Sequence, residues 1–346
     1  MKEKVLLGMS GGVDSSVSAI LLQNDGYEVI GITIKMFENG NEKSVEDAKK
    51  VCEKLGIEHL VVDLKEEFKS YVIEDFVCNY SNCKTPNPCI ECNRFLKFKA
   101  LYEIAKGIGI NFIATGHYAK IEFNDKYNRY VIKKSESDKK DQTYFLYNIQ
   151  KEILEHVLFP LCNFKDKDEI REIAKKNGLE VSNKPDSQDV CFIENNDYIS
   201  FLEKNGISKK KGNIVDLEGN VLGKHEGLYK YTIGQRKGLG ISYKCPLYVI
   251  GFNKEKNQVI VGEEKDLYKK EVLIEKINLL LVDTLEDGME VQSKIRYSQK
   301  SSKAIIKIIN EDEIVLCFDE PQRGVTPGQS AVFYKDDILI GGGKIK

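Results

Sequence analysis

The segment TPNPCIECNRFLKF (85–98) places two cysteines, Cys89 and Cys92, three positions apart, where turn-forming residues lead into a basic helical pattern. A third cysteine, Cys191, lies among polar and acidic residues in KPDSQDVCFIE (184–194). Thiolates act as nucleophiles, exchange with disulfides and bind metals. The spacing alone therefore leaves open a metal clip, a disulfide switch and a catalytic thiol.

A glycine-containing loop with the composition of a phosphate site lies near the start of the sequence. MSGGVDSS (9–16) follows an apolar strand pattern and opens a helical one, so its backbone N–H groups and the helix N-terminus suit an anion. The lysine of a Walker A loop is missing, and the loop does not match GxGxxG. Asp14 could hold Mg²⁺ or orient a phosphate. The pattern SGGxDS resembles the fingerprint of PP-loop ATP pyrophosphatases, which break ATP between the α and β phosphates and transfer AMP.

The composition is that of a globular protein with more than one domain. The chain has 346 residues, 41% hydrophobic and 31% charged, with a net charge of −2. No apolar run approaches the roughly 20 residues of a membrane span, and no signal peptide is recognisable, so we expect a cytoplasmic protein without membrane contact. Nine cysteines in such a chain do not indicate a disulfide framework.

Strand and helix patterns alternate in the first half of the chain, which predicts a parallel sheet with helices on both faces and ligands at the carboxyl ends of its strands. The expected strands are 4–9, 27–37, 59–64 and 111–119, and the expected helices are 15–26, 44–56, 66–80 and 90–107.

After about residue 200, short strand patterns separated by charged or glycine turns replace the alternation. We therefore expect an α/β protein whose N-terminal domain (1–200) is a Rossmann-like PP-loop parallel sheet. A small β-rich central domain (201–267) and a C-terminal β-barrel (268–346) would follow.

Long motifs in all three regions resemble the tRNA-specific 2-thiouridylases of the MnmA family. The matching stretches are LLGMSGGVDSSVSAILL, TPNPCIECNRFLKF, ATGHYAKI, KKDQTYFLYNI, DSQDVCFI, HEGLYKYTIGQRKGLGI and PQRGVTPGQSAVFY. The resemblance implies 2-thiolation of the wobble uridine in tRNAs for lysine, glutamate and glutamine. ATP with Mg²⁺ would activate the C2 oxygen, and a cysteine persulfide would supply sulfur. The expected partners are tRNA and a sulfur donor, either a cysteine desulfurase or a persulfide carrier.

The resemblance also implies a role for individual residues. Cys92 matches the nucleophile and Cys191 the cysteine that receives the persulfide. The implied ATP contacts are Gly8, Met9, Ser10, Gly11, Gly12, Val13, Asp14, Ser15, Ile34 and Gly116. The implied contacts with the target base and the rest of the tRNA are Asn87, Pro88, Cys89, His117, Lys140, Asp141, Gln142, Arg296, Tyr297 and Gln329.

One position departs from the family pattern, because many members have Asp where this chain has Cys89.

The cysteines have three interpretations. In the first, Cys191 carries the persulfide and Cys92 then attacks Cys191, leaving a disulfide. The helix N-terminus, Arg94 and Lys97 would favour the thiolates. In the second, Cys89, Cys92 and Cys191 hold a [4Fe-4S] cluster whose open iron binds hydrosulfide. In the third, four cysteines hold a structural zinc. These are Cys78, Cys83, Cys89 and Cys92.

Two other functions remain open at this point. Another PP-loop synthetase, using ammonia, would need neither Cys92 nor Cys191. A non-catalytic tRNA-binding module could use the loop only to sense nucleotide.

Overall fold

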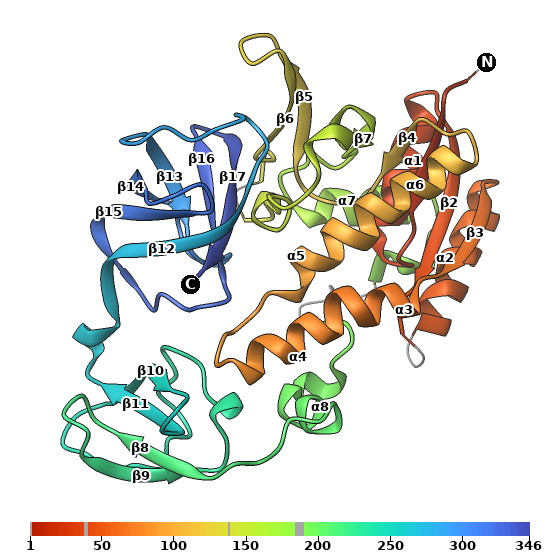
Figure 1. Ribbon diagram of the computed structural model, residues 1–346. Coiled ribbons are helices and arrows are strands. Elements are labelled where there is room, and N and C mark those ends of the chain that lie inside the picture. Colours follow the sequence, from red (N-terminus) through yellow and green to blue (C-terminus); the bar gives the residue numbers. More distant parts are fainter. Residues whose placement is uncertain (1, 38–40, 138, 184–189) are drawn as a thin grey trace.

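The computed structural model describes residues 2–37, 41–137, 139–183 and 190–346. Three regions follow one another along the chain (Figure 1): an α/β region, a small β sheet below it, and a barrel beside it. Residues 186–189 of the DSQDVCFI motif lie outside the described residues.

The first region is built on a parallel sheet with the order β3-β2-β1-β4-β7. Side chains alternate across β1, so Val5 and Leu7 enter one core cluster and Leu6 enters the other. The strand order reverses at β1, which has β2 on one side and β4 on the other. The five strands are β1 (Lys4–Gly8), β2 (Glu28–Lys35), β3 (Glu58–Asp63), β4 (Phe112–Ala114) and β7 (Val157–Leu158).

Helices cover both faces of this sheet, as the alternation predicts. On one face lie α1 (Val13–Asn24), α2 (Asn41–Leu55) and α7 (Lys167–Lys176), which share a core cluster with Val5 and Leu7. The other face is covered by the segment 88–107, whose Phe98, Leu101 and Ala105 pack with Leu6.

Each of the two long helices expected at 66–80 and 90–107 contains a π-helical section. The first runs through α3 (Lys65–Phe68), η1 (Lys69–Ile73) and α4 (Glu74–Ser81). The second runs through α5 (Pro88–Cys92), η2 (Asn93–Ala100) and α6 (Leu101–Gly107). The helices are confirmed; their π sections, which occur often at functional sites, have no signature in the sequence.

The strand expected at 111–119 is shorter than predicted, and a hairpin of β5 (Lys120–Asn124) and β6 (Arg129–Lys133) follows it. This hairpin was not predicted. It joins the barrel sheet, because Lys133 of β6 pairs with Ile338 of β17. The remaining short elements of this region are η3 (Thr143–Phe145), η4 (Lys151–His156), η5 (Glu180–Asn183), η6 (Glu194–Asn196) and α8 (Tyr198–Lys204).

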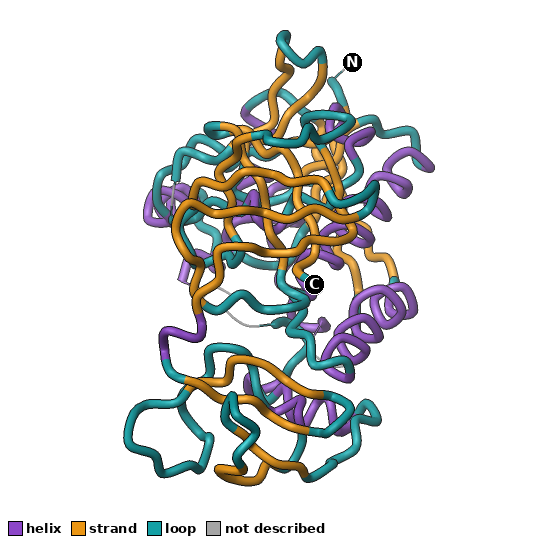
Figure 2. Tube along the Cα trace, turned by 60° about the vertical axis from the view of Figure 1, so that its left-hand side comes forward, coloured by secondary structure: helices purple, strands orange, loops and turns teal. Residues whose placement is uncertain are grey.

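The central region is a sheet with the order β10-β11-β8-β9. Its strands are β8 (Gly212–Val215), β9 (Val221–His225), β10 (Tyr248–Asn253) and β11 (Gln258–Gly262), with η7 (Leu228–Lys230) and η8 (Glu264–Leu267) beside them. The tube view (Figure 2) shows it as a separate layer below the barrel.

The C-terminal strands form a closed antiparallel barrel, because β12 pairs with both β15 and β17. Its strands are β12 (Tyr268–Leu279), β13 (Glu290–Lys294), β14 (Ser302–Ile308), β15 (Glu313–Arg323), β16 (Ser330–Lys335) and β17 (Ile338–Ile345). The expected fold class is confirmed. Within the described ranges, the helices are all too short or too polar to cross a membrane.

Candidate active site

The predicted phosphate loop connects the carboxyl end of β1 to helix α1. Gly12 precedes the helix and no side chain caps it, so the first-turn N–H groups are not used by a capping side chain. Gly11 has a φ of +68°, and a Cβ there would lie 2.6 Å from the Ser44 carbonyl oxygen. Only glycine fits this turn. The hydroxyls of Ser10 and Ser15 lie 3.2 Å apart inside the loop.

The two other predicted ATP contacts lie at the same edge of the sheet. Ile34 is at the end of β2, and Gly116 follows β4. A Cβ on Gly116 would lie 3.0 Å from the Asp14 carbonyl carbon and the Ser15 nitrogen. The segment after β4 therefore packs against the phosphate loop, and this close approach requires a glycine.

Helix α7 supplies the lysine that the loop lacks. Lys167 Nζ lies 2.9 Å from Asp14 Oδ2, with its side chain only 13% exposed. The Tyr118 hydroxyl donates to Asp14 Oδ1 at 2.9 Å. The loop N–H groups, the ammonium and the carboxylate are a donor set that fits a polyphosphate and its Mg²⁺. Lys167 is 153 positions from Asp14 in sequence, and no local motif pointed to it.

Cys92 lies directly beyond the carboxyl end of β2. Its Sγ atom is 3.9 Å from Sδ of Met36, the residue that follows β2. The side chain is 6% exposed and belongs to a core cluster that also contains Phe192 and Ile193, the neighbours of Cys191. The thiol is therefore at the same edge of the sheet as the phosphate loop.

The three predicted cysteines meet around Lys97. Its ammonium interacts electrostatically with the thiols of Cys92, Cys89 and Cys191. The π-helical section explains why Lys97 and Cys92, five residues apart, meet. In an α-helix this spacing turns the side chains about 140° apart. The wider turn of the π-helical section, which begins directly after Cys92, reduces this angular separation.

The structure favours the protonated thiol of Cys92, whereas the sequence suggested a thiolate. Burial raises the pKa of its thiol to about 12, and the charge of Lys97 only partly opposes this. Cys92 is at the end of α5, within the continuous helix, whereas the helix begins at Pro88, so Cys89 and not Cys92 lies in its first turn. Arg94 does not stabilise a thiolate on these cysteines, because its Nη1 donates to Asn148 Oδ1 at 2.7 Å. Of the two expected cations, only Lys97 acts on Cys92.

Cys89 and Cys191 are more accessible than Cys92. Both are exposed residues and both carry free thiols. Asn87 caps the helix by accepting a hydrogen bond from the Cys89 N–H at 3.2 Å, and Pro88 occupies the first helical position. Although Cys191 is exposed as a residue, burial of its thiol raises the pKa of that thiol, and the charge of Lys97 partly opposes the rise.

The described residues contain no group of three or more His, Cys, Asp or Glu side chains arranged to hold a metal ion. The geometry therefore does not fit a preformed [4Fe-4S] site at Cys89, Cys92 and Cys191, or a zinc site at Cys78, Cys83, Cys89 and Cys92. We derive no step through either metal centre.

The residues that the resemblance implied for tRNA contact fall into different environments. His117 is half-buried beside Lys97, and burial followed by this charge lowers the pKa of its imidazole to about 3. Asp141 is buried and accepts a hydrogen bond from the Thr143 hydroxyl. Gln142 Oε1 accepts the Tyr118 N–H at 2.9 Å. Lys140 is partly exposed.

Arg296, Tyr297 and Gln329 connect regions of the chain. Arg296 Nη2 donates to the carbonyl oxygens of Gly324 in the barrel and Ile233 in the central region. Tyr297 is 37% exposed and packs on Phe145 with ring centroids 4.5 Å apart. Gln329 Nε2 donates to the Thr85 carbonyl at 2.7 Å. In this structure, Arg296 and Gln329 thus hold segments together, and Tyr297 keeps an exposed ring.

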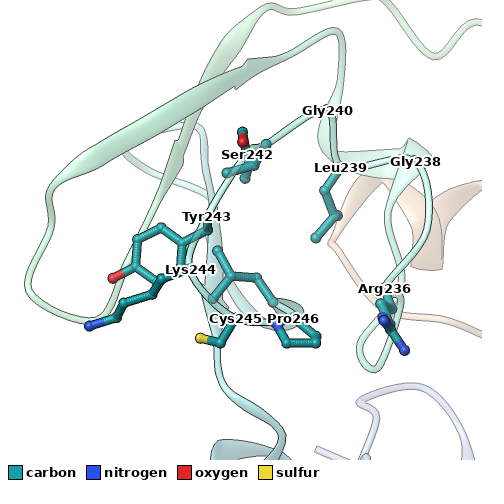
Figure 3. Close-up of a pocket in the computed structure, with 11 residues that line it drawn as sticks. Arg236, Gly238, Leu239, Gly240, Ser242, Tyr243, Lys244, Cys245 and Pro246 are labelled. Carbon is teal, nitrogen blue, oxygen red and sulfur yellow. The ribbon is translucent and has the colours of Figure 1, made fainter.

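A cavity of about 710 Å³ lies elsewhere, in the central region. The loop 236–247 lines it, with Arg236 and Lys244 on opposite sides in Figure 3. None of the residues predicted for ATP, sulfur or tRNA lines this cavity. The end of the glycine-rich basic segment TIGQRKGLG (232–240) and the residues that follow it, up to Leu247, form its lining.

Three family models match successive parts of the chain. These are the tRNA methyl transferase HUP domain over residues 3–195, the tRNA methyl transferase PRC-barrel domain over 199–263 and the aminomethyltransferase beta-barrel domain over 269–345. Among solved structures, a 4-thiouridine synthetase–RNA complex with bound ATP covers 58% of this chain and 50% of its own. Its TM-score is 0.37 and its sequence identity to this chain is 21%.

Full-length relatives are much more similar. The tRNA-specific 2-thiouridylase MnmA of Clostridioides difficile is 49% identical and covers 100% of this chain and 99% of its own length. MnmA 1 of Clostridium botulinum is 50% identical, covering 100% of both chains. MnmA of Acetivibrio thermocellus is 47% identical, covering 100% of this chain and 99% of its own. The chain therefore belongs to the family of tRNA-specific 2-thiouridylases.

Proposed function

We propose that this protein is a tRNA-uridine 2-sulfurtransferase that uses ATP. The substrate is the wobble uridine of tRNAs for lysine, glutamate and glutamine, and oxygen at C2 is replaced by sulfur. The observation that carries this proposal is the contact of Cys92 with Met36 at the sheet edge that also bears the phosphate loop, with Lys97 and Cys191 within electrostatic range of the thiol. The names of relatives about 50% identical over the whole chain support the same reaction.

In the first half of the reaction, the uridine C2 oxygen attacks the α-phosphate of ATP, and pyrophosphate leaves. The loop N–H groups of α1 and the Lys167 ammonium offset the negative charge of the polyphosphate. Bound Mg²⁺ would supply further charge neutralisation, with the Asp14 carboxylate as its protein ligand. AMP on the oxygen makes that oxygen a leaving group.

In the second half, a sulfur donor first places a persulfide on Cys191, which is exposed. The terminal persulfide sulfur attacks C2, and AMP leaves with the oxygen. Cys92 then attacks the Cys191 sulfur, the bond between that sulfur and the one on C2 breaks, and 2-thiouridine is released. This leaves a Cys92–Cys191 disulfide, which a thiol reductant must return to two thiols before the next turnover.

Lys97 provides the fixed positive charge for these thiol steps. Burial lowers the pKa of its ammonium, but the charge of thiolates on the three cysteines outweighs this and gives a net rise, so Lys97 carries its proton when a thiolate forms beside it. A thiolate on Cys92 or Cys191 is stabilised by this charge, which lies on the same helix as Cys92. The predicted tRNA contacts remain part of the proposal, with Asn87–Cys89 at the target base. They are His117, Lys140, Asp141, Gln142, Arg296, Tyr297 and Gln329.

The test is a single-turnover reaction of the purified protein with ATP, Mg²⁺, a persulfide source and unmodified lysine tRNA. We expect AMP, pyrophosphate and 2-thiouridine in nucleoside analysis. Cys92→Ser and Cys191→Ser should each abolish 2-thiouridine while ATP binding persists, and Cys245→Ser in the central region is the control. Full thiolation by both variants, or AMP formation with no effect of tRNA, would disprove the proposal.

Other reactions are tested in the same mixture. Ammonia in place of the sulfur source tests an amide-forming PP-loop synthetase, which has no use for the two cysteines. S-adenosylmethionine tests methyl transfer, which the descriptions of two family models name. Anaerobic purification with iron and sulfide analysis tests the alternative in which a [4Fe-4S] cluster carries the hydrosulfide.

We further propose that the protein is located in the cytoplasm and receives sulfur from a cysteine desulfurase or a persulfide carrier. The proposed domains are 1–200, 201–267 and 268–346. Limited proteolysis would locate the linkers, and pull-down with a desulfurase would test direct docking.

A further inference from the structure

A buried ion pair joins the barrel to the short helix that bears the cysteines. Lys344 Nζ on β17 lies 2.8 Å from Glu91 Oε1 on α5, and the two side chains are 16% and 12% exposed. Glu91 directly precedes Cys92 in sequence. Because this ion pair is poorly solvated, its surroundings hold it in one geometry. Removing one partner leaves the other charge buried without a counter-charge, which destabilises the fold.

The Lys344 backbone is fixed within the barrel. Its register partners are Ser330 on β16 and Glu275 on β12, the strand that closes the barrel. The ammonium therefore projects from a rigid sheet. It also interacts with Asp75 on α4, so one lysine faces carboxylates from both long helices. Figure 1 shows the barrel beside these two helices.

The same end of the barrel holds the residues that precede α5. The Thr85 N–H donates to the Pro327 carbonyl at 2.8 Å, and Gln329 donates back to the Thr85 carbonyl. Lys84 pairs with Glu275 at 3.1 Å. The segment 84–92 is thus attached to the barrel at both of its ends, once before the helix and once beside Cys92.

From this geometry we infer that Lys344 is a positioning residue for Cys92, and that the barrel forms part of the scaffold of the thiol site. The ion pair sets the rotation of α5, which keeps the Cys92 thiol within its buried contact to Met36. The positioning stands on the contacts alone. Its consequence for sulfur transfer rests on the proposed function.

The test measures alkylation of Cys92 by iodoacetamide in the full-length protein, with fragment spectra that separate Cys92 from Cys89. Cys52, which is fully buried in α2 within a different core cluster, reports global unfolding in the same sample. We expect Lys344→Met to raise the Cys92 rate about tenfold without changing the Cys52 rate, because the unpaired Glu91 releases α5.

A matched control lies two residues further along. Lys346 forms an exposed ion pair with Glu313, so Lys346→Met should leave both rates unchanged. Glu91→Gln keeps its volume and breaks the same buried pair, and should reproduce the selective rise at Cys92. The double variant Glu91→Leu/Lys344→Met replaces the pair by apolar side chains, and should restore protection of Cys92.

Two results would overturn the inference. In one, Lys344→Met and Glu91→Gln leave the Cys92 rate as in the parent protein. In the other, both raise the Cys92 and Cys52 rates together, which would make the pair an element of global stability. Alkylation needs neither ATP nor tRNA, so either result is independent of whether the chain thiolates tRNA. If it does, Lys344→Met should lower kcat about tenfold and leave KM for tRNA within about twofold.

Discussion

Cys92 Sγ lies 3.9 Å from Met36 Sδ, at the point where β2 ends and the nucleotide edge of the sheet begins. Ile34, two positions before Met36, is one of the residues predicted to line the adenosine. The contact thus joins the proposed sulfur-transfer site to the proposed adenylation site through one short segment. Substitutions can test the groups on either side of this Cys92–Met36 contact.

Lys97 should control the reactivity of Cys92. Because the Cys92 pKa is about 12, its thiolate fraction at pH 8 is small and increases about tenfold for each pH unit up to that value. Lys97→Met removes the opposing charge and should raise the pKa further, slowing alkylation of Cys92 at pH 8 about three- to tenfold. Lys97→Arg should retain most of the rate. Equal rates in Lys97→Met and in the control Lys99→Met would contradict this role.

Lys167 should serve the ATP step. Lys167→Met removes the ion pair to Asp14 but leaves the hydrogen bond from Tyr118, and it takes a cation away from the phosphate loop. We expect ATP affinity to fall about tenfold or more, measured by calorimetry with Mg²⁺, while tRNA affinity is retained. Lys165→Met, on an exposed residue two positions earlier, is the control. Unchanged ATP affinity in Lys167→Met would exclude the assignment.

Gly116 should be essential for the shape of the phosphate loop. A Cβ 3.0 Å from the Ser15 nitrogen forces the loop or the segment after β4 to move. Gly116→Ala should therefore destabilise the fold by about 1–3 kcal/mol and weaken ATP binding. Gly107→Ala, where a Cβ meets nothing within 4 Å, should do neither. Thermal unfolding with and without ATP measures both effects.

His117 should make the fold sensitive to mild acid. Its pKa is about 3 in the folded protein and 6.5 in the reference state, so between these values the unfolded chain binds a proton that the folded chain does not. The contribution is fully present above pH 6.5 and is lost as pH falls below it, by about 2 kcal/mol at pH 5. In His117→Gln, the loss of stability between pH 7.5 and pH 5 should shrink by about that amount. Parallel pH profiles for parent and variant would show that His117 is not responsible.

Cys89 should be dispensable for sulfur transfer. It is exposed, and the described residues do not place it in a metal-binding group. Cys89→Ser should keep thiolation within about tenfold of the parent protein, whereas Cys92→Ser should not. A complete loss in Cys89→Ser, together with bound iron and sulfide in the parent, would instead favour the cluster-based reaction.

The sequence by itself determined the features that depend on neighbouring residues. The turn chemistry of SGGVDSS and the apolar periodicity around it predicted a strand, a loop and a helix, and the structure contains all three. Anion binding by this loop stays a prediction. Alternation of such units predicted the parallel sheet, because helical crossovers link parallel strands. Motif identity also implied a shared site for Cys92 and Cys191, and the folded chain brings the two thiols within electrostatic range of each other.

Only the tertiary structure decided the features that depend on distant residues or on burial. Lys167 reaches Asp14 from 153 positions away, and Lys344 reaches Glu91 from the barrel. The hairpin β5–β6 pairs with β17, far along the chain. Burial, which no local pattern reports, made Cys92 a protonated thiol where helix position suggested a thiolate. Periodicity and turn preferences are local, whereas desolvation and charge pairing are set by whichever parts of the chain fold against each other.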